Sequence, residues 1–348
     1  MNEESWRRII SGERLDVLAR AARPLLKAAS YPYLAGAFLH RWAYSGKLLR
    51  PREASLPVIS IGNITVGGTG KTPLVQYLVG LLREEGAVPA VLTRGYRGDS
   101  EFADEPAMLR ASTAAMVVVN PHRWAGAKKA ATDGADVCVL DDGFQHVRLA
   151  RDLDIVAVDA TCPLGYGHLL PRGLLREPVS ALRRADAIVL TRCDQAGPGE
   201  LRAISGKLRL LAPRALLAES VLAPSGLRGA EGQLVGPQEL VGRKVWAFCG
   251  LGNPAGFYRT LTDLGAELAG RTTFNDHHAY SQKDIDSLVA QCGSAGASML
   301  VTTAKDAVKL PRWLDRTAIR SLEVELRITA GEPALKERIS QVLSARGL

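Results

Sequence analysis

One stretch of the sequence decides the fold: residues 58–72 read VISIGNITVGGTGKT, and Pro73 follows. The first four residues form an apolar run typical of a buried strand, and the rest form a glycine-rich loop that ends in Lys-Thr. Glycines let backbone N–H groups turn inward onto phosphate oxygens, and a helix N-terminus adds partial positive charge. Proline suits the first helical turn, where no needed donor is lost. The stretch therefore predicts a strand, a phosphate-binding loop and a helix.

The residues of this loop have distinct expected roles. Lys71 is expected to reach the β- and γ-phosphates of a nucleotide, and the Thr72 hydroxyl is expected to hold magnesium. The loop that surrounds the phosphates comprises Thr65, Gly67, Gly68, Thr69, Gly70, Lys71 and Thr72. A glycine-rich turn that binds no ligand is the alternative interpretation.

The loop departs from the strict pattern G-x-x-x-x-G-K-[ST], because Thr65 stands at its first glycine. It is closer to the G-G-x-G-K-T loop of partition-type ATPases. Those enzymes carry a second lysine just before the paired glycines, where this chain has Val66. The difference argues against a partition ATPase whose extra lysine acts across a dimer.

A second apolar run supplies acidic residues. Residues 137–142 read VCVLDD, so the run ends in Asp141 and Asp142. A carboxylate at the end of such a strand lies beside the magnesium ion of a bound nucleotide. We assign Asp141 to the metal, together with Thr72, and Asp142 to catalysis, although the sequence does not distinguish the two acids. A solvated turn is the alternative for this pair.

The apolar runs along the chain are continuous rather than alternating, as a parallel sheet covered on both faces requires. They occupy residues 58–61, 88–93, 116–119, 137–140, 155–158 and 187–191. Residues 74–83 and 123–132 are expected to be helices between them. The pattern predicts an α/β fold: a P-loop domain with a doubly wound, mostly parallel sheet.

A smaller α/β domain is expected to follow. Its signals are strands at 244–250 and 299–303 and helices at 257–264 and 284–291. Residues 224–237 are rich in glycine and proline and are expected to form a linker. The predicted parts are an N-terminal helical segment (1–50), a P-loop core (51–225) and a smaller C-terminal α/β domain (226–348).

The N-terminal segment is basic and aromatic. Residues 1–52 carry ten of the Lys and Arg residues and four of the acids, so they hold +6 of the net charge of +8. A basic helix with neighbouring aromatics suits a membrane interface, and each basic side chain near an anionic leaflet adds about 1 kcal/mol. The segment is expected to be helical over 6–49, with breaks at Pro24 and Pro32. A helical pair packed on the next domain is the alternative.

No membrane span is expected, because the uncharged stretch 28–40 is shorter than the ~20 residues that a spanning helix needs. No cleavable signal peptide is expected either. The five cysteines are scattered without the CxxC spacing of a zinc or redox site, so they are expected to be reduced and structural, as in the cytosol.

Further strings, together with the loop, resemble the tetraacyldisaccharide 4'-kinases over about residues 57–310. They are Gly62-Asn63, Arg94-Gly95-Tyr96, Asp104-Glu105-Pro106, Asp141-Asp142-Gly143-Phe144-Gln145-His146, Leu170-Pro171-Arg172-Gly173-Leu174-Leu175-Arg176-Glu177-Pro178, Gly250-Leu251-Gly252-Asn253-Pro254, Asp276-His277-His278 and Thr303-Ala304-Lys305-Asp306-Ala307. The resemblance implies transfer of the γ-phosphate of ATP, with Mg2+, to the 4'-hydroxyl of a tetraacylated glucosamine disaccharide 1-phosphate.

The resemblance also implies catalytic residues. A sugar hydroxyl is a poor nucleophile, so a carboxylate within hydrogen-bond reach is needed to accept its proton. In this family that role falls to the Asp of the D-E-P string, here Asp104, helped by a histidine of the second domain. We assign the histidine to His277, with His278 as the alternative. From the residues alone, Asp104 also suits a helix N-cap and His277 a solvated loop.

A second group of candidates is expected to contact the acceptor or phosphate. It comprises Arg94, Arg123, Gln145, His146, Arg176 and Glu177. The fork of donors on arginine fits phosphate better than a point charge does, although surface salt bridges are the alternative use. Because the acceptor is an amphiphile with an anionic head, we expect a peripheral enzyme, monomeric, on the cytoplasmic face of the inner membrane.

Three rival functions are weaker. Thr191-Arg192-Cys193-Asp194 is similar to the [NT]-K-x-D guanine-binding motif, which favours a GTPase or partition-type ATPase switch, but Arg replaces its Lys. A nucleic-acid-binding ATPase would explain the basic charge, yet no nucleic-acid motif is present and no nucleic acid is expected as partner. A non-catalytic membrane scaffold would not need Lys71.

Overall fold

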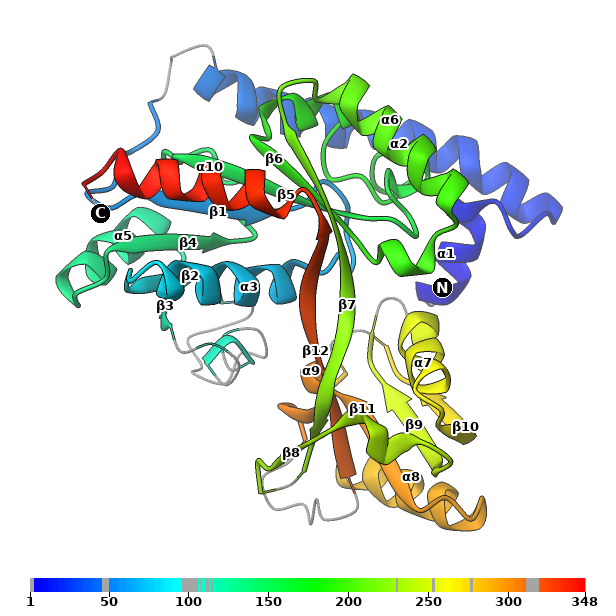
Figure 1. Cartoon of the computed structure of the whole chain (residues 1–348). Coiled ribbons are helices and arrows are strands. Elements are labelled where there is room, and N and C mark those ends of the chain that lie inside the picture. The colour runs from blue at the N-terminus through cyan, green and yellow to red at the C-terminus, as the bar shows by residue number, and fades with distance from the viewer. Residues whose placement is uncertain are drawn as a thin grey trace. The chain divides into compact units, whose positions relative to one another are not determined.

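The computed structural model describes residues 3–45, 50–95, 106, 108–110, 113, 115–229, 231–251, 254–275, 278–310 and 319–347. The chain forms two compact units (Figure 1). Unit 1 comprises Met1–Gly95, Thr113–Val221 and Arg327–Leu348, and unit 2 comprises Tyr96–Ser112 and Leu222–Leu326. The predicted domain boundaries stay predictions. Helix α10 (Glu332–Ser344), near the end of the chain, lies in unit 1. Tyr77 of unit 1 donates a 2.9 Å hydrogen bond to Glu332 at the start of this helix.

Unit 1 is built on a parallel sheet in the order β7-β6-β5-β1-β4-β2-β3. The strands are β1 (Val58–Gly62), β2 (Pro89–Thr93), β3 (Met116–Val119), β4 (Val137–Asp141), β5 (Leu153–Asp159), β6 (Ala187–Thr191) and the first part of β7 (Leu216–Arg228). Every residue of β1, β2, β4, β5 and β6 is buried, which confirms the prediction from continuous apolar runs. In register, Ile61 of β1 pairs with Asp141 of β4, so the loop and the acids leave the sheet at the same edge.

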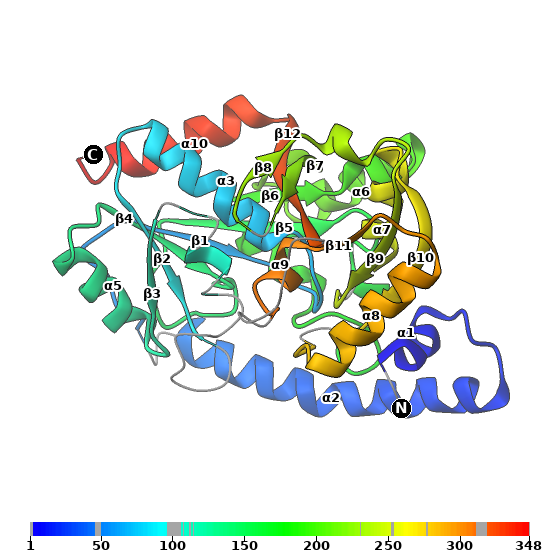
Figure 2. The same cartoon turned by 90° about the horizontal axis from the view of Figure 1, so that it is seen from below.

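Helices cover both faces of this sheet. In Figure 2, α3 (Lys71–Glu84) and α10 lie on one side of it and α2 (Val17–Ser45) lies on the other. The other helices of unit 1 are α1 (Glu3–Ser11), α5 (Arg123–Thr132), α6 (Pro198–Leu211) and the 3-10 turns η1 (Gly165–Gly167), η2 (Val179–Arg184) and η3 (Cys193–Gln195). Helix α3 buries Leu74, Leu78 and Leu82 at turn spacing, which packs it against β1 and β4.

Unit 2 has its own sheet order, β10-β9-β11-β12-β7, in which β9, β10, β11 and β12 are parallel. Its elements are β8 (Leu234–Val235), η4 (Pro237–Leu240), β9 (Lys244–Cys249), α7 (Pro254–Asp263), β10 (Glu267–Thr273), α8 (Gln282–Ser294), β11 (Met299–Thr303), α9 (Ala304–Ala307) and β12 (Ile319–Ala330). The whole chain is thus a mixed α/β protein with mostly parallel strands, as predicted.

The N-terminal segment corrects one expectation. Helix α2 runs through Pro24 and Pro32 without a break, although an internal proline costs about 3 kcal/mol. Contacts on both sides of each proline hold it: Arg23 donates to the carbonyls of Ile9 and Arg14, Ser30 to that of Leu169 at 3.1 Å, and Tyr33 to that of Arg176 at 2.9 Å. Tertiary hydrogen bonds therefore hold this helix in place despite its weak local propensity. No helix among the described residues is long and apolar enough to cross a bilayer.

The expected linker at 224–237 is also wrong. The chain passes from unit 1 to unit 2 inside strand β7, which continues to Arg228, and β8 pairs with it antiparallel. Gly226 is required there, because a Cβ would lie 2.6 Å from the carbonyl oxygen of Val235. Close packing of two strands thus explains a glycine that, from the sequence alone, indicates a loop.

Candidate phosphate-transfer site

The glycine-rich loop joins β1 to α3 and has the backbone that its sequence predicts. Gly67 and Gly70 have φ angles of 106° and 81°, which glycine adopts without strain. Gly62 is needed for a different reason, since a Cβ there would lie 2.5 Å from the Cβ of Phe144. Among the described residues, no backbone N–H group of residues 67–72 has a hydrogen-bond acceptor. Such a run of open N–H groups ahead of a helix is an anion-binding arrangement.

Three polar side chains hold the glycine-rich loop in place by hydrogen bonds. The Asn63 amide donates to Thr69 Oγ1 at 2.9 Å, and the Thr191 hydroxyl donates to the Thr69 carbonyl at 2.9 Å. The Gln145 amide donates to the Asn63 carbonyl at 2.7 Å. Asn63, Thr69 and Thr191 are all buried, so these bonds are shielded from water. The loop is therefore preorganised before any ligand binds.

A second segment of the chain, residues 165–176, pairs with the loop along its edge; we call it the strap. The N–H of Val66 donates to the Leu174 carbonyl at 2.8 Å, and the N–H of Arg176 donates to the Ile64 carbonyl at 2.7 Å. Thr65 and Leu175 form an antiparallel bridge between these bonds. The strap therefore engages the Val66 N–H and the Ile64 carbonyl at the start of the loop and leaves the N–H groups of residues 67–72 open.

Asp142 contacts two cations of the site, Lys71 and Arg176. Arg176 Nη1 donates to both of its carboxylate oxygens, at 2.9 and 2.8 Å, and Lys71 Nζ lies 3.4 Å from Oδ1. Burial of this carboxylate would by itself raise its pKa, but the charges and hydrogen bonds of Lys71 and Arg176 outweigh it and lower the pKa. Asp142 is therefore ionised at neutral pH. Asp141 is buried at the end of β4, level with Ile61.

His146, Arg94 and Arg123 share one positively charged neighbourhood. Burial, together with the charges of Arg123, Arg148, Arg151 and Arg94, lowers the pKa of His146 to about 4. Arg123 is buried at the start of α5, where it donates to the Asn120 carbonyl at 3.0 Å, whereas Arg94 is exposed. His146 is thus neutral at pH 7 and able to accept as well as donate a hydrogen bond.

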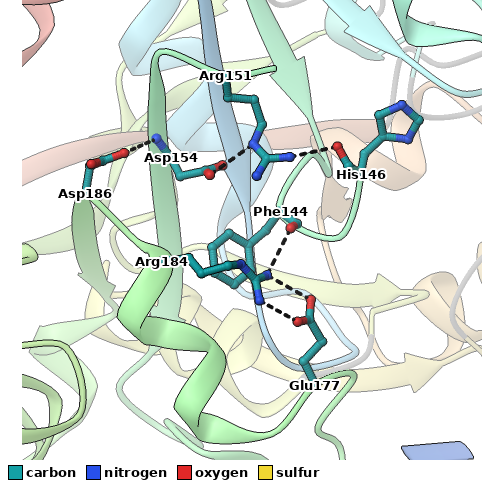
Figure 3. A network of polar contacts seen from close by, with 7 residues as sticks. All are labelled: Phe144, His146, Arg151, Asp154, Glu177, Arg184 and Asp186. Atoms are coloured by element: carbon teal, nitrogen blue, oxygen red, sulfur yellow. Dashed lines mark hydrogen bonds and ion pairs between the residues drawn. The ribbon is translucent and has the colours of Figure 1, made fainter. Parts of the chain in front are cut away.

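Two arginines hold the turn that contains Gln145 and His146 (Figure 3). Arg184 donates to both oxygens of Glu177, at 2.9 and 3.2 Å, and to the Phe144 carbonyl at 3.2 Å, with its guanidinium 4.3 Å from the centre of the Phe144 ring. Arg151 donates to the His146 carbonyl at 2.8 Å and to Asp154 at 3.0 Å. Glu177, expected to touch the acceptor, thus lies buried against Arg184.

The two residues expected to be the base and its helper, Asp104 and His277, lie outside the described residues. The alternative His278 is described, within unit 2. Its Nε2 lies 3.1 Å from Asp284 Oδ2, and its ring stacks on Phe274 with centroids 4.5 Å apart. Across the described ranges, no three His, Cys, Asp or Glu side chains are grouped so that they could hold a metal ion together.

A buried acid of unit 2 holds the start of another glycine string. Asp306 accepts from the N–H of Gly250 at 3.0 Å and from the Thr303 hydroxyl at 2.7 Å, and Lys309 Nζ lies 3.4 Å away. Its side chain is fully buried. The strings that begin at Gly250 and Thr303 therefore have a structural role, because Asp306 joins them through hydrogen bonds.

Asn63, Thr191 and Arg184 also shape the site and are not among the residues that the sequence predicts for it. Asn63 stood inside the quoted loop and Thr191 ended a predicted strand, so both carried a signal; Arg184 carried none.

The guanine-binding motif fails as a rival, because Arg192 forms an ion pair with Asp159 at the end of β5. All five cysteines are free, and burial raises the pKa of Cys138 to about 12.

Comparison with known proteins agrees with this geometry. The family model of the tetraacyldisaccharide-1-P 4'-kinases matches residues 22–344. Among curated relatives, a tetraacyldisaccharide 4'-kinase of Anaeromyxobacter dehalogenans is 41% identical over 345 residues, covering 92% of this chain and 91% of the relative. One of Geobacter metallireducens is 39% identical over 323 residues, covering 87% and 93%.

A solved structure is similar over nearly the whole chain as well. It is LpxK from Aquifex aeolicus in complex with ATP, with a TM-score of 0.72 and 28% sequence identity. The similarity covers 92% of this chain and 99% of that one. The match extends beyond the loop and the acids to both units of the chain.

Proposed function

Because the chain belongs to the tetraacyldisaccharide-1-P 4'-kinase family, we propose that it transfers the γ-phosphate of ATP to the 4'-hydroxyl of a tetraacylated glucosamine disaccharide 1-phosphate in lipid A biosynthesis. One observation carries the nucleotide half of the proposal: open backbone N–H groups at residues 67–72 lie beside the ammonium of Lys71. Preorganised donors of this kind stabilise charge on a transferring phosphoryl group without reorganisation. The kinase class follows from the family.

The residues around the loop fit a magnesium nucleotide. Thr72 stands in the first turn of α3 and Asp141 ends the neighbouring strand β4, so these two side chains would hold the ion. Magnesium with such oxygen ligands neutralises charge on the β- and γ-phosphates. Thr65, Gly67, Gly68, Thr69 and Gly70 would supply the backbone around the phosphates.

Lys71 is expected to change partners when the nucleotide binds. Its ammonium lies 3.4 Å from Asp142, a loose contact, while Arg176 makes two shorter bonds to the same carboxylate. A terminal phosphate offers Lys71 more negative charge than Asp142 does, and Asp142 keeps Arg176 when Lys71 leaves. Asp142 thus serves to hold two cations toward the site until the phosphate arrives.

The acceptor side is assigned to five side chains. Arg94, Arg123 and Arg176 offer guanidinium groups for phosphate oxygens, and Gln145 and His146 offer hydrogen bonds for sugar hydroxyls. Asp104 is proposed as the general base, with His277 as its helper. Glu177 is proposed to act through Arg184 rather than by contact with the sugar, because both of its oxygens accept from that arginine.

The N-terminal helices are proposed to hold the enzyme on the cytoplasmic face of the inner membrane. Leu15, Val17, Leu18, Leu25 and Tyr31 are all more than 60% exposed. Apolar side chains beside arginines on an exposed helix suit the boundary between head groups and acyl chains. We expect a monomer, since the proposed reaction requires no second copy.

A direct assay tests the proposal. Purified protein is incubated with γ-labelled ATP and the lipid A disaccharide monophosphate, and label in the lipid phase is counted for wild type, Lys71→Ala and Asp104→Ala. We expect transfer by wild type and a large loss in both variants. Transfer that survives in Asp104→Ala would remove that residue from the role of base. A preference for GTP over ATP in competition would favour the switch interpretation.

Membrane binding needs a separate experiment. Leu18→Glu and Leu25→Glu place charge on the exposed face of α2 without touching its buried residues, and sedimentation with anionic vesicles measures binding. We expect weaker binding than for wild type. Equal sedimentation of wild type and both variants would refute the membrane role of α2.

A further inference from the structure

Helix α1 is docked on the strap by side chains from both partners. The Trp6 indole donates to the Pro171 carbonyl at 3.2 Å, and the Arg172 guanidinium donates to the Ile10 carbonyl at 2.9 Å. Ile9 and Ile10 are buried. Since the strap itself pairs with the loop through Val66 and Arg176, the position of α1 is tied to that of the phosphate-binding loop.

This docking brings a cation of α1 to the loop. A Cβ built on Gly67 would lie 3.6 Å from Nη2 of Arg7, so the guanidinium lies on the side-chain side of Gly67, close to where the open N–H groups begin. Arg7 is half-buried, and its charge also acts on the hydroxyl of Tyr166 in the strap. Its neighbour Arg8, on the same helix, is exposed. One of the two arginines therefore faces the loop.

The sequence of the loop gives this placement a purpose. Loops of the G-G-x-G-K-T type in partition ATPases carry a second lysine immediately before the paired glycines, and here that position is Val66. Val66 brings no charge, and its N–H donates to Leu174 of the strap. Arg7 brings a positive charge to the glycine that follows Val66, from a helix of the same chain.

We propose that Arg7 is a phosphate-binding residue of the nucleotide site, a second cation beside Lys71 for the terminal phosphates of ATP. The inference rests on the proposed function for the identity of the ligand. Guanidinium is suited to the task because it presents several donors in one plane and remains charged at every physiological pH. The N-terminal segment thus takes part in nucleotide binding as well as in membrane association.

The test compares Arg7→Ala and Arg7→Lys with Arg8→Ala, a matched loss of one arginine from the same helix. Dissociation constants for ATP, ADP and AMP are measured with Mg2+ by calorimetry, without the lipid acceptor. Because a hydrogen bond to a charged group is stronger than one between neutral groups, we expect Arg7→Ala to weaken ATP binding ~10-fold or more. The loss is expected to be smaller for ADP and absent for AMP, with Arg7→Lys intermediate and Arg8→Ala like wild type.

Several outcomes would overturn the inference. They are unchanged ATP affinity in Arg7→Ala, an equal loss for all three nucleotides, or an equal loss in Arg8→Ala. The equal loss across nucleotides would mean that Arg7 only supports the docking of α1. Because binding is measured without acceptor, a wild type that binds no ATP would instead refute the proposed function itself.

Discussion

Two aspartates, one in each unit, meet a lysine beside a glycine-containing turn, and they differ mainly in their access to water. Asp142 of unit 1 has 28% of its side chain exposed, and its lysine partner, Lys71, has 17%. Asp306 of unit 2 has a side chain with no exposure, and Lys309 has 3%. The Nζ to carboxylate distance is 3.4 Å in both.

The comparison teaches that burial decides what such a pair can do. An ion pair in partial contact with water can exchange one partner for a ligand, since both charges remain solvated during the exchange. A fully buried pair cannot, because water does not replace the contact that is lost when the two charges separate. The same residue types therefore serve ligand binding in unit 1 and folding in unit 2.

The largest effect is expected from opening the buried pair. Asp306→Ala leaves the Gly250 N–H and Lys309 without their carboxylate, so we expect the free energy of unfolding of unit 2 to fall by about 3–5 kcal/mol. Urea unfolding followed by tryptophan fluorescence, to which Trp246 of unit 2 contributes, measures it. Asp263→Ala, which removes an exposed ion pair with Arg259, is the control and is expected to cost less than about 1 kcal/mol. Similar losses of unfolding free energy in Asp306→Ala and Asp263→Ala would show that burial does not decide what these ion pairs contribute.

Breaking the partly exposed pair of Lys71 and Asp142 is expected to reduce activity rather than stability. Lys71→Ala should lower kcat/KM by about 10²–10³-fold, the usual cost of one preorganised donor to the reacting charge. Its urea midpoint should stay near that of wild type, because Asp142 keeps Arg176. Transfer of label to lipid and urea unfolding are measured on the same preparation, with Lys129→Ala as the control for an exposed lysine. Strong destabilisation by Lys71→Ala would show that this pair also serves folding.

An intermediate case lies between the two extremes. Arg184 and Glu177 have 20% and 10% of their side chains exposed, and Arg184 also holds the Phe144 carbonyl. We expect Arg184→Met to reduce kcat ~10-fold while KM for ATP changes little, since the turn with Gln145 and His146 would shift. Steady-state kinetics over ATP and acceptor concentrations separate the two constants. Restored kcat in Arg184→Lys would support positioning through the carbonyl; a pure rise in KM for ATP would contradict it.

The smallest effect concerns pH. The folded pKa of His146, about 4, lies below its ordinary value of 6.5, so the unfolded chain takes up this proton first as pH falls. This contribution to stability is complete above pH 6.5 and is lost between pH 6.5 and 4. We expect His146→Gln to have a shallower loss of urea midpoint over that range than wild type, with His122→Gln as control. Parallel curves for wild type and His146→Gln would show that the histidine titrates as it does in water.

The sequence predicts most of the sheet and the phosphate loop because their signals are local. Residues 58–72 contain a strand, its loop and the start of a helix without reference to any distant residue. Strands β7 and β12 were missed, because Pro224 and Gly226 in the first and alternating charges in the second conceal them. Local patterns fail where tertiary packing overrides propensity.

Pairings between distant residues account for the rest. The sequence names Lys71, Asp142 and Arg176 as candidates, but their mutual contacts depend on how β1, β4 and the strap meet in space. The sequence gives Glu177 a direct role in the site, and only the structure reveals its ties to Arg184. Arg7 stood in a segment interpreted by its composition alone, which has no information on the direction of a single side chain.

Strands β7 and β12 have a consequence for synthesis on the ribosome. The chain leaves unit 1 within β7 and returns to it within β12, so the larger segment of unit 2, Leu222–Leu326, is an insertion and α10 is made last. At ~5–20 residues per second, the nascent kinase core waits several seconds after Val221 for its closing helix. Unit 2 emerges in the meantime and is free to fold, while the half-finished nucleotide domain stays exposed to chaperones and proteases until translation ends.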